Sequence, residues 1–114
     1  QTVVFEDIDG TVQLRGISGI AGDPNPHLIT RTSFAYLLTV INNGDTNHRL
    51  YIEGLNVQTN LLEPGEQETL IIYPDKEGNY KYFDKRQWLK PLGILEVITV
   101  VPSDEFSGIW RDLI

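Results

Sequence analysis

Hydrophobic and polar residues alternate in short runs along most of the chain, which is the pattern of β-strands with one buried face. The run 48–54 shows it most clearly, because His48, Leu50 and Ile52 fall on one face and polar residues on the other. The run 33–42 is apolar on both faces, so we expect a strand that is buried on both sides. The sequence predicts seven strands in all, over residues 2–5, 11–15, 33–42, 48–54, 68–73, 79–83 and 93–101.

Turn residues separate these runs at short intervals. Asn43-Gly44-Asp45 and Pro64-Gly65 are strong turn signals, because Asn and Gly tolerate positive φ and Pro fixes it. The Gly- and Pro-rich stretch 17–28 predicts a loop. Seven short strands at this spacing indicate an all-β sandwich, and 114 residues correspond to a single domain, 1–114.

The last twelve residues, 103–114, carry the pattern of a short C-terminal helix. Ser103 can cap it, and the acidic residues that follow suit the positive end of the helix dipole. An apolar stripe at helical spacing comes next, formed by Phe106, Ile109, Trp110 and Leu113. We expect this stripe to pack either on the chain's own sandwich or on another subunit, and Trp110 is a partner-binding candidate in the second case.

The N-terminal run TVVFEDIDGTV contains Asp7-Ile8-Asp9-Gly10-Thr11. This DxDGT sequence resembles the nucleophile motif of haloacid-dehalogenase-type phosphatases, in which the first aspartate attacks phosphorus and the second acts as acid and base. Those aspartates need a sheet of parallel strands joined by helices. Here the motif lies between two predicted strands of an all-β chain, so a turn is the favoured interpretation and a DxDGT phosphatase is a remote alternative.

The composition narrows the function further. The net charge of −7, from 16 acidic and 9 basic residues, argues against nucleic acid as a partner. No apolar run approaches the roughly 18 residues of a transmembrane segment. Because position 1 is Gln, we expect an exported, periplasmic or extracellular domain whose start was removed, with a membrane tether in its precursor as one option.

From Pro24 onward the order of segments resembles the cupredoxins, the Greek-key β-sandwiches of blue copper proteins and of the copper domain in oxidase subunit II. Members of that family show a buried strand ending in Asn, an inward His, a Pro-Gly turn, a Gly-x-Tyr-x-Tyr strand and a final Gly-x-Leu-x-Val strand. The matching positions are Asn42, His48, Pro64-Gly65, 78–82 and 93–97. The resemblance covers residues 24–101 and implies a cupredoxin-like Greek-key sandwich.

The same resemblance locates the copper ligands, and most of them are replaced. A blue copper site takes two imidazoles, a thiolate and usually a thioether. The family's first histidine corresponds to His48 and its cysteine to Asp84, or to Phe83 if the register slips by one. Its second histidine and its methionine correspond to Gln87 and to Pro91 or Leu92. Because the chain has no Cys and no Met, a blue-copper centre is excluded, and we expect no cofactor.

Two interpretations of His48 stay open. In the first it is structural, with a ring nitrogen bonded to a loop carbonyl. In the second His48 and Asp84 form a weak mononuclear copper or zinc site, completed by His27 or water, although one imidazole and one carboxylate are few ligands for either metal.

The stretch 84–91 is a basic strip around one tryptophan in an acidic protein. The resemblance implies that it lies at the end of the sandwich where cupredoxins dock their partners. Trp88 and Leu89 are then expected anchors with Lys85, Arg86 and Lys90 as a charged rim, since Trp and Arg dominate interface energies. Alternatively, Trp88 folds back over the core.

These observations together predict a copper-free cupredoxin-like domain that has no catalysis of its own. We expect a structural or protein-interaction module, as the soluble part of an exported or membrane-bound respiratory or oxidase assembly. Its partners would be proteins or the subunits of a membrane complex. The alternative is a protein that binds a single metal ion, copper first, through His48 and Asp84.

Overall fold

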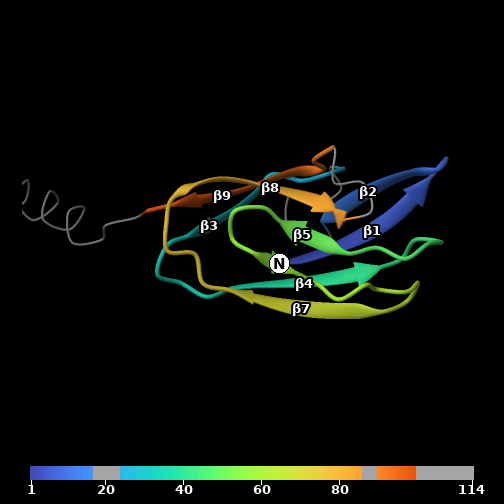
Figure 1. Cartoon of the computed structure of the whole chain (residues 1–114), viewed down its shortest axis with the longest axis horizontal. Coiled ribbons are helices and arrows are strands. Elements are labelled where there is room, and N and C mark those ends of the chain that lie inside the picture. Colours follow the sequence, from blue (N-terminus) through green and yellow to red (C-terminus); the bar gives the residue numbers. More distant parts are fainter. Residues whose placement is uncertain (17–23, 86–89, 100–114) are drawn as a thin grey trace, which may run out of the picture.

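The computed structural model describes residues 1–16, 24–85 and 90–99. These residues form two mixed sheets, one with the order β2-β1-β4-β7 and one with the order β3-β9-β8-β5-β6 (Figure 1). The strands are β1 (Thr2–Ile8), β2 (Thr11–Gly16), β3 (Leu28–Arg31), β4 (Tyr36–Asn42), β5 (Leu50–Ile52), β6 (Val57–Gln58), β7 (Gln67–Ile72), β8 (Gly78–Asp84) and β9 (Gly93–Ile98).

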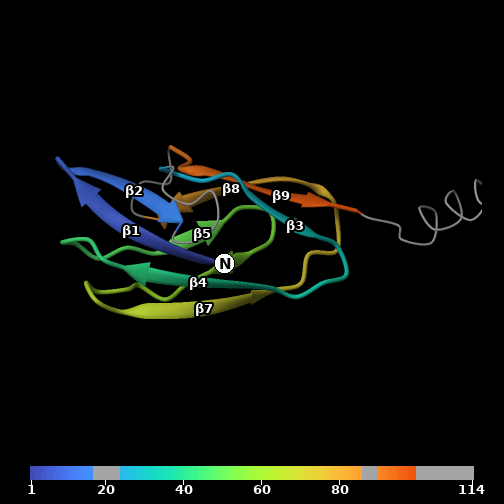
Figure 2. The same cartoon turned by 180° about the vertical axis from the view of Figure 1, so that it is seen from behind.

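The two sheets face each other, and the view from behind shows the same arrangement of strands (Figure 2). Buried side chains between the sheets form one hydrophobic core. Each long strand contributes alternate residues to it, for example Val3 and Phe5 from β1 and Leu38 and Val40 from β4, all fully buried. Strand β1 pairs parallel with β4 and β3 parallel with β9, while the other pairs are antiparallel. The predicted all-β sandwich is thereby confirmed.

The prediction that the strand at 33–42 is buried on both sides is wrong. Leu38 and Val40 are 0% exposed, but Leu37 is 53% exposed on the opposite face. The second sheet covers only one side of β4, so the other side faces solvent. Strand β4 also begins at Tyr36, and Phe34 before it is 56% exposed.

Two short strands were not predicted, β3 and β6. Strand β6 has only two residues. Strand β3 has four, and it comes directly after a Pro-rich loop. Both are too short to show a clear alternation of hydrophobic and polar residues. The predicted helix at 103–114 lies outside the described residues, as do positions 100–101 of the last predicted strand.

The DxDGT run forms the hairpin between β1 and β2. Asp9 and Gly10 have φ of 52° and 78°, the pair of positive values that a type I′ hairpin turn requires. The predicted turn is therefore present, but Asp7 lies before it, within β1. In the described part of the chain no helix joins the parallel strands, so the sheet that the phosphatase motif needs is not formed there.

Candidate functional site

His48 lies just before β5 at one end of the sandwich, where its backbone pairs with Leu62 through two hydrogen bonds of 2.9 and 2.7 Å. Its side chain is 3% exposed. The ring stacks on Phe5 of β1, with centroids 4.8 Å apart and planes 19° apart. Backbone pairing and ring stacking together fix both the position and the plane of the imidazole.

Asp84, the last residue of β8, points inward beside His48, because its partner across the sheet is the buried Leu50. Its Oδ2 lies 2.7 Å from His48 Nδ1, and its side chain is 1% exposed. The structure therefore brings together the two residues that the sequence named as candidate ligands. Phe83 would take the place of the family's cysteine if the alignment shifted by one residue. Its side chain points to the outer face of the sheet and lines a different hollow.

Asp7 is the third member of the site, and the sequence suggested it only as part of the DxDGT motif and not as a partner of His48. Both of its carboxylate oxygens lie 3.0 Å from His48 Nε2, and its side chain is 15% exposed. A signal was present, since Asp7 continues the alternation of the buried Val3 and Phe5 and is a charged residue in phase with the core. The three side chains Asp7, His48 and Asp84 are called the histidine–carboxylate network below.

The loop after β4 positions the Asp7 carboxylate. Asp7 Oδ2 accepts the backbone N–H groups of Asp45 and Thr46 at 2.7 and 3.1 Å, and the Thr46 hydroxyl at 3.2 Å. The fully buried Asn42 braces this loop by donating to the Thr46 carbonyl at 2.8 Å and accepting from Gly44 N at 2.9 Å.

Gly44 is needed here for space. A Cβ at this position would overlap the carboxylate of Asp7 and lie 3.1 Å from His48 Nε2. The turn signal Asn43-Gly44-Asp45 is thus also part of the site, because the missing side chain lets the loop close over the network.

The network shifts the ionisation of its members. Burial lowers the pKa of His48, but its hydrogen bonds to Asp84 and Asp7 and the negative charges of these carboxylates outweigh burial and raise the pKa above its ordinary value. Burial raises the pKa of Asp7, but the bonds from His48 and from the Asp45 and Thr46 amides outweigh it and lower the pKa. Both shifts favour an imidazolium that donates from each ring nitrogen to a carboxylate.

The structural interpretation of His48 needs a correction, because carboxylates and not a loop carbonyl bind its ring nitrogens. The two nitrogens of an imidazole point in divergent directions, so Asp7 and Asp84 lie on opposite sides of the ring and cannot join His48 at a single ion. In the described residues no group of three or more His, Asp or Glu side chains is arranged to hold a metal. His27 bonds instead to Glu96 on β9, at 2.8 Å.

A hollow of about 300 Å³ opens over the network. It is lined by Asp7, Asp9, Gly10, Asp45, Thr46, His48 and Asp84. Its walls come from the β1–β2 hairpin, the loop after β4 and the end of β8, so segments far apart in the sequence meet there.

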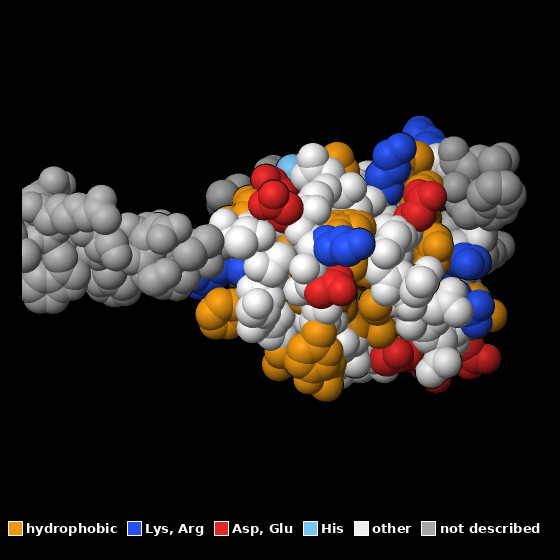
Figure 3. All heavy atoms as spheres, turned by 60° about the vertical axis from the view of Figure 1, so that its left-hand side comes forward, with side chains coloured by type: hydrophobic (Ala, Val, Ile, Leu, Met, Phe, Trp, Pro, Cys, Tyr) orange, Lys and Arg blue, Asp and Glu red, His pale blue; other side chains and the backbone are white. Residues whose placement is uncertain are grey.

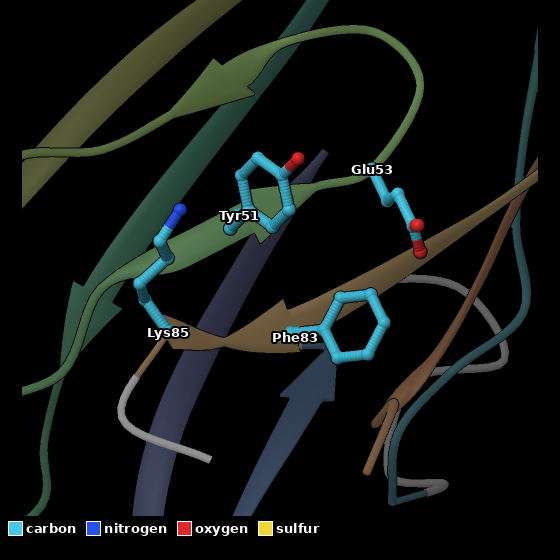
Figure 4. Close-up of a pocket in the computed structure, with 4 residues that line it drawn as sticks. All are labelled: Tyr51, Glu53, Phe83 and Lys85. Atoms are coloured by element: carbon cyan, nitrogen blue, oxygen red, sulfur yellow. The ribbon is translucent and has the colours of Figure 1, made fainter. Parts of the chain in front are cut away.

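Of the predicted partner-binding residues, the structure describes Lys85 and Lys90, and both are exposed. Lys85 Nζ lies 4.1 Å from the centroid of the Tyr51 ring. Figure 4 shows Lys85 and Glu53 on opposite sides of Tyr51, around a hollow of about 320 Å³ that Phe83 also lines. Arg86, Trp88, Leu89 and Trp110 lie outside the described residues.

No protein-family model matches the sequence, and no curated protein sequence matches it either. The structure, in contrast, is similar to many solved structures. A purple cupredoxin from Nitrosopumilus maritimus shares 17% identity at a TM-score of 0.55, over 84% of this chain and 97% of its own. Lac15 from a marine microbial metagenome shares 16% identity at a TM-score of 0.63, over 88% of this chain and 32% of its own.

The multicopper oxidase mgLAC is similar as well, at 15% identity and a TM-score of 0.62, over 91% of this chain and 40% of that enzyme. The chain thus spans two fifths or less of these two larger proteins. At such low identity the similarity defines the fold alone. The protein is a cupredoxin-like β-sandwich, as its sequence resemblance implied.

Among the described residues no helix is long and apolar enough to cross a membrane.

Proposed function

We propose that this chain is a copper-free cupredoxin-like domain that acts as a structural and protein-interaction module and has no catalysis of its own. One observation carries the proposal. At the position where the resemblance expects the cysteine ligand, the carboxylate of Asp84 binds His48 Nδ1 at 2.7 Å. A thiolate at this position would bind a metal together with the histidine. The carboxylate of Asp84 instead forms a hydrogen bond with Nδ1 of the imidazole, the atom that would bind the metal.

The network supports a structural role because it joins the two sheets. Asp7 belongs to β1 in the first sheet, while Asp84 belongs to β8 in the second and His48 leads into β5. Hydrogen bonds between ionised groups are shorter and stronger than neutral ones. Three buried or nearly buried groups thus hold this end of the sandwich closed, a role that needs no ion.

The interaction role is proposed for the loop that follows Asp84. Lys85 and Lys90 bracket it and are exposed, in a protein whose net charge is −7. We place Arg86, Trp88 and Leu89 in the same docking surface, with an acidic surface of a protein subunit as the partner. An exported or membrane-bound respiratory assembly, as the sequence led us to expect, is the setting we propose.

Binding of a single Cu(II) or Zn(II) ion is the second candidate, because two carboxylates lie within hydrogen-bond distance of one imidazole. Both ring nitrogens are occupied, so an ion would have to displace Asp7 or Asp84 from His48. Several names among the structural neighbours are those of copper proteins, which is why this candidate is kept.

One purification experiment tests both parts of the proposal. The tagged chain is used as bait in an extract of its source organism, once with a chelator and once with added copper. We expect the same partner in both preparations and far less than one copper per chain by mass spectrometry of the elements. Trp88→Ala combined with Lys85→Glu should lose the partner, because it removes the anchor and reverses one rim charge.

Lys76→Glu is the matched control, since Lys76 is also exposed but lies in the loop between β7 and β8 at the other end of the sandwich. Equal loss of the partner in both variants would contradict the docking surface. One copper bound per chain, with the binding heat abolished in His48→Ala, would replace the proposal by the second candidate. If Trp88→Ala/Lys85→Glu unfolds, Trp88 belongs to the core and the interaction role fails.

A further inference from the structure

The outer face of β4 and β7 carries exposed apolar side chains at one end of the sandwich. Leu37 is 53% exposed, Ile71 56% and Tyr73 74%. Leu37 and Ile71 are direct partners across the two strands, and Tyr73 follows on the same face as Ile71. These three residues are called the apolar patch. It lies at the end opposite the histidine–carboxylate network.

The outward side chains of β4 and β7 beside the patch carry no charge, although the N-terminal ammonium of Gln1 donates to the Leu37 carbonyl at 3.1 Å. The other outward residues of β4 and β7 are Thr39, Ile41, Gln67 and Thr69, and the hydroxyls of Thr39 and Thr69 lie 2.9 Å apart. Strand β7 is also the last strand of its sheet. An exposed edge with apolar side chains attracts other strands or segments, and proteins usually cover one.

The chain leaves β9 directly beside the patch. Thr32 N donates to the Ile98 carbonyl at 2.9 Å, and the hydroxyl of Thr32 lies 3.4 Å from that of Thr99. The next residue, Ser33, donates to the carbonyl of Pro74 at 3.3 Å, and Pro74 follows Tyr73. Thr99 and the patch are thus linked through two neighbouring residues. In Figures 1 and 2 the ends of β9 and β7 lie at the same end of the molecule.

We propose that residues 103–114 fold back and dock on the apolar patch through Phe106, Ile109, Trp110 and Leu113. As a helix, Phe106 to Leu113 is about 10 Å long at 1.5 Å per residue. The patch is about 7 Å along β7 and about 5 Å across to β4, at ordinary strand spacing. Figure 3, which turns this end forward, shows hydrophobic side chains at the surface there.

Charge favours the chain's own segment as the occupant. Arg31, at the end of β3, is exposed beside the exit of the chain, with its guanidinium 4.9 Å from the centroid of the Phe34 ring. Asp104 and Glu105 come immediately before the stripe, so they would face Arg31 as the segment turns back. Trp110 is then assigned to the chain's own sandwich. This inference goes beyond the proposed function, which concerns the opposite end.

Fluorescence quenching of Trp110 tests the docking. In the chain of residues 1–114, Trp88→Phe leaves Trp110 as the only tryptophan. We expect acrylamide to quench it several-fold less than a free tryptophan, and Leu37→Lys/Ile71→Lys to remove that protection. Ile29→Lys is the control, because Ile29 is 58% exposed on the other sheet. If Trp88→Phe does not fold, hydrogen exchange of β7 in Ile109→Asp, expected to be faster than in the unmodified chain, gives the same test.

Exchanging the charges of Arg31 and of Asp104 and Glu105 tests whether these residues attract each other in the docked state. Arg31→Glu should increase quenching of Trp110, and Asp104→Arg/Glu105→Arg in the same chain should restore protection. Equal quenching in the patch variant and in the parent chain, or exchange in β7 unchanged by Ile109→Asp, would overturn the proposal. Protection that depends on protein concentration, together with the mass of a dimer in sedimentation, would also overturn it and assign the patch to a second copy.

Discussion

Asp84→Ala is expected to lower the free energy of unfolding by about 3 kcal/mol or more at neutral pH, because it removes one partner of a buried ion pair and leaves Asp7 alone to balance the charge of His48. Asp84 is 1% exposed, and His48 Nδ1 would lose its acceptor. Since 1 kcal/mol moves the melting temperature of a domain near this size by about 4 °C or more, we expect a fall of at least about 10 °C. Denaturant unfolding and calorimetry measure both quantities.

Asp75→Ala is the matched control, because Asp75 is exposed in the loop between β7 and β8. A surface substitution of this kind usually changes stability by less than about 0.5 kcal/mol. If Asp84→Ala costs no more than Asp75→Ala, the network does not stabilise the sandwich, and the structural part of the proposed function is lost.

Gly44→Ala is expected to cost about 1–3 kcal/mol, the usual range for forcing an extra methyl group into a packed site. The new Cβ would overlap the Asp7 carboxylate and lie 3.1 Å from His48 Nε2. Either the loop moves away, which breaks the bonds from Asp45 and Thr46, or the carboxylate leaves the imidazole. Denaturant unfolding again measures the loss.

A double-mutant cycle with Asp7→Ala shows whether the collision is the cause. Once the carboxylate is gone, the methyl group of Gly44→Ala has room, so its cost should be clearly smaller in the Asp7→Ala background. Residues in contact deviate from additivity by about 0.5–3 kcal/mol. Strictly additive costs would show that Gly44 acts through the backbone alone and not through the network.

The sequence predicted the framework of the fold because its strands alternate so regularly. His48, Leu50 and Ile52 were expected on the inner face, and all three are buried. The same reasoning failed where aliphatic residues face solvent. Leu37 of β4 has the same hydrophobicity as the buried Leu38, so the pattern alone could not show which sides of the strand are covered.

The site was predicted only in part, because its residues lie far apart in the sequence and because the DxDGT run could be explained as a turn. His48 and Asp84 are 36 residues apart, and only the family resemblance suggested their pairing. Asp7 is 41 residues from His48, and the turn chemistry of Asp9-Gly10 gave the DxDGT run a sufficient explanation without it. Gly44 was recognised as a turn residue, but its contact with Asp7 depends on the tertiary fold.

The pKa shifts give the stability a defined pH dependence. The pKa of His48 is raised, so its contribution is complete below the ordinary 6.5 and is lost as the pH rises through the higher folded value. The pKa of Asp7 is lowered, so its contribution is complete above the ordinary 3.8 and is lost as the pH falls through the lower folded value. Each group changes the free energy by at most about 1.4 kcal/mol per pH unit.

The ring nitrogens of His48 report most directly on whether carboxylates occupy the place of a metal. Nitrogen-15 NMR of the imidazole, followed over pH and after one equivalent of Zn(II), observes both of them. The account predicts a midpoint above 6.5, protons on both nitrogens below it, and spectra that zinc leaves unchanged. A ring that titrates at or below 6.5, or an Nδ1 that gives up its proton to zinc, would contradict it.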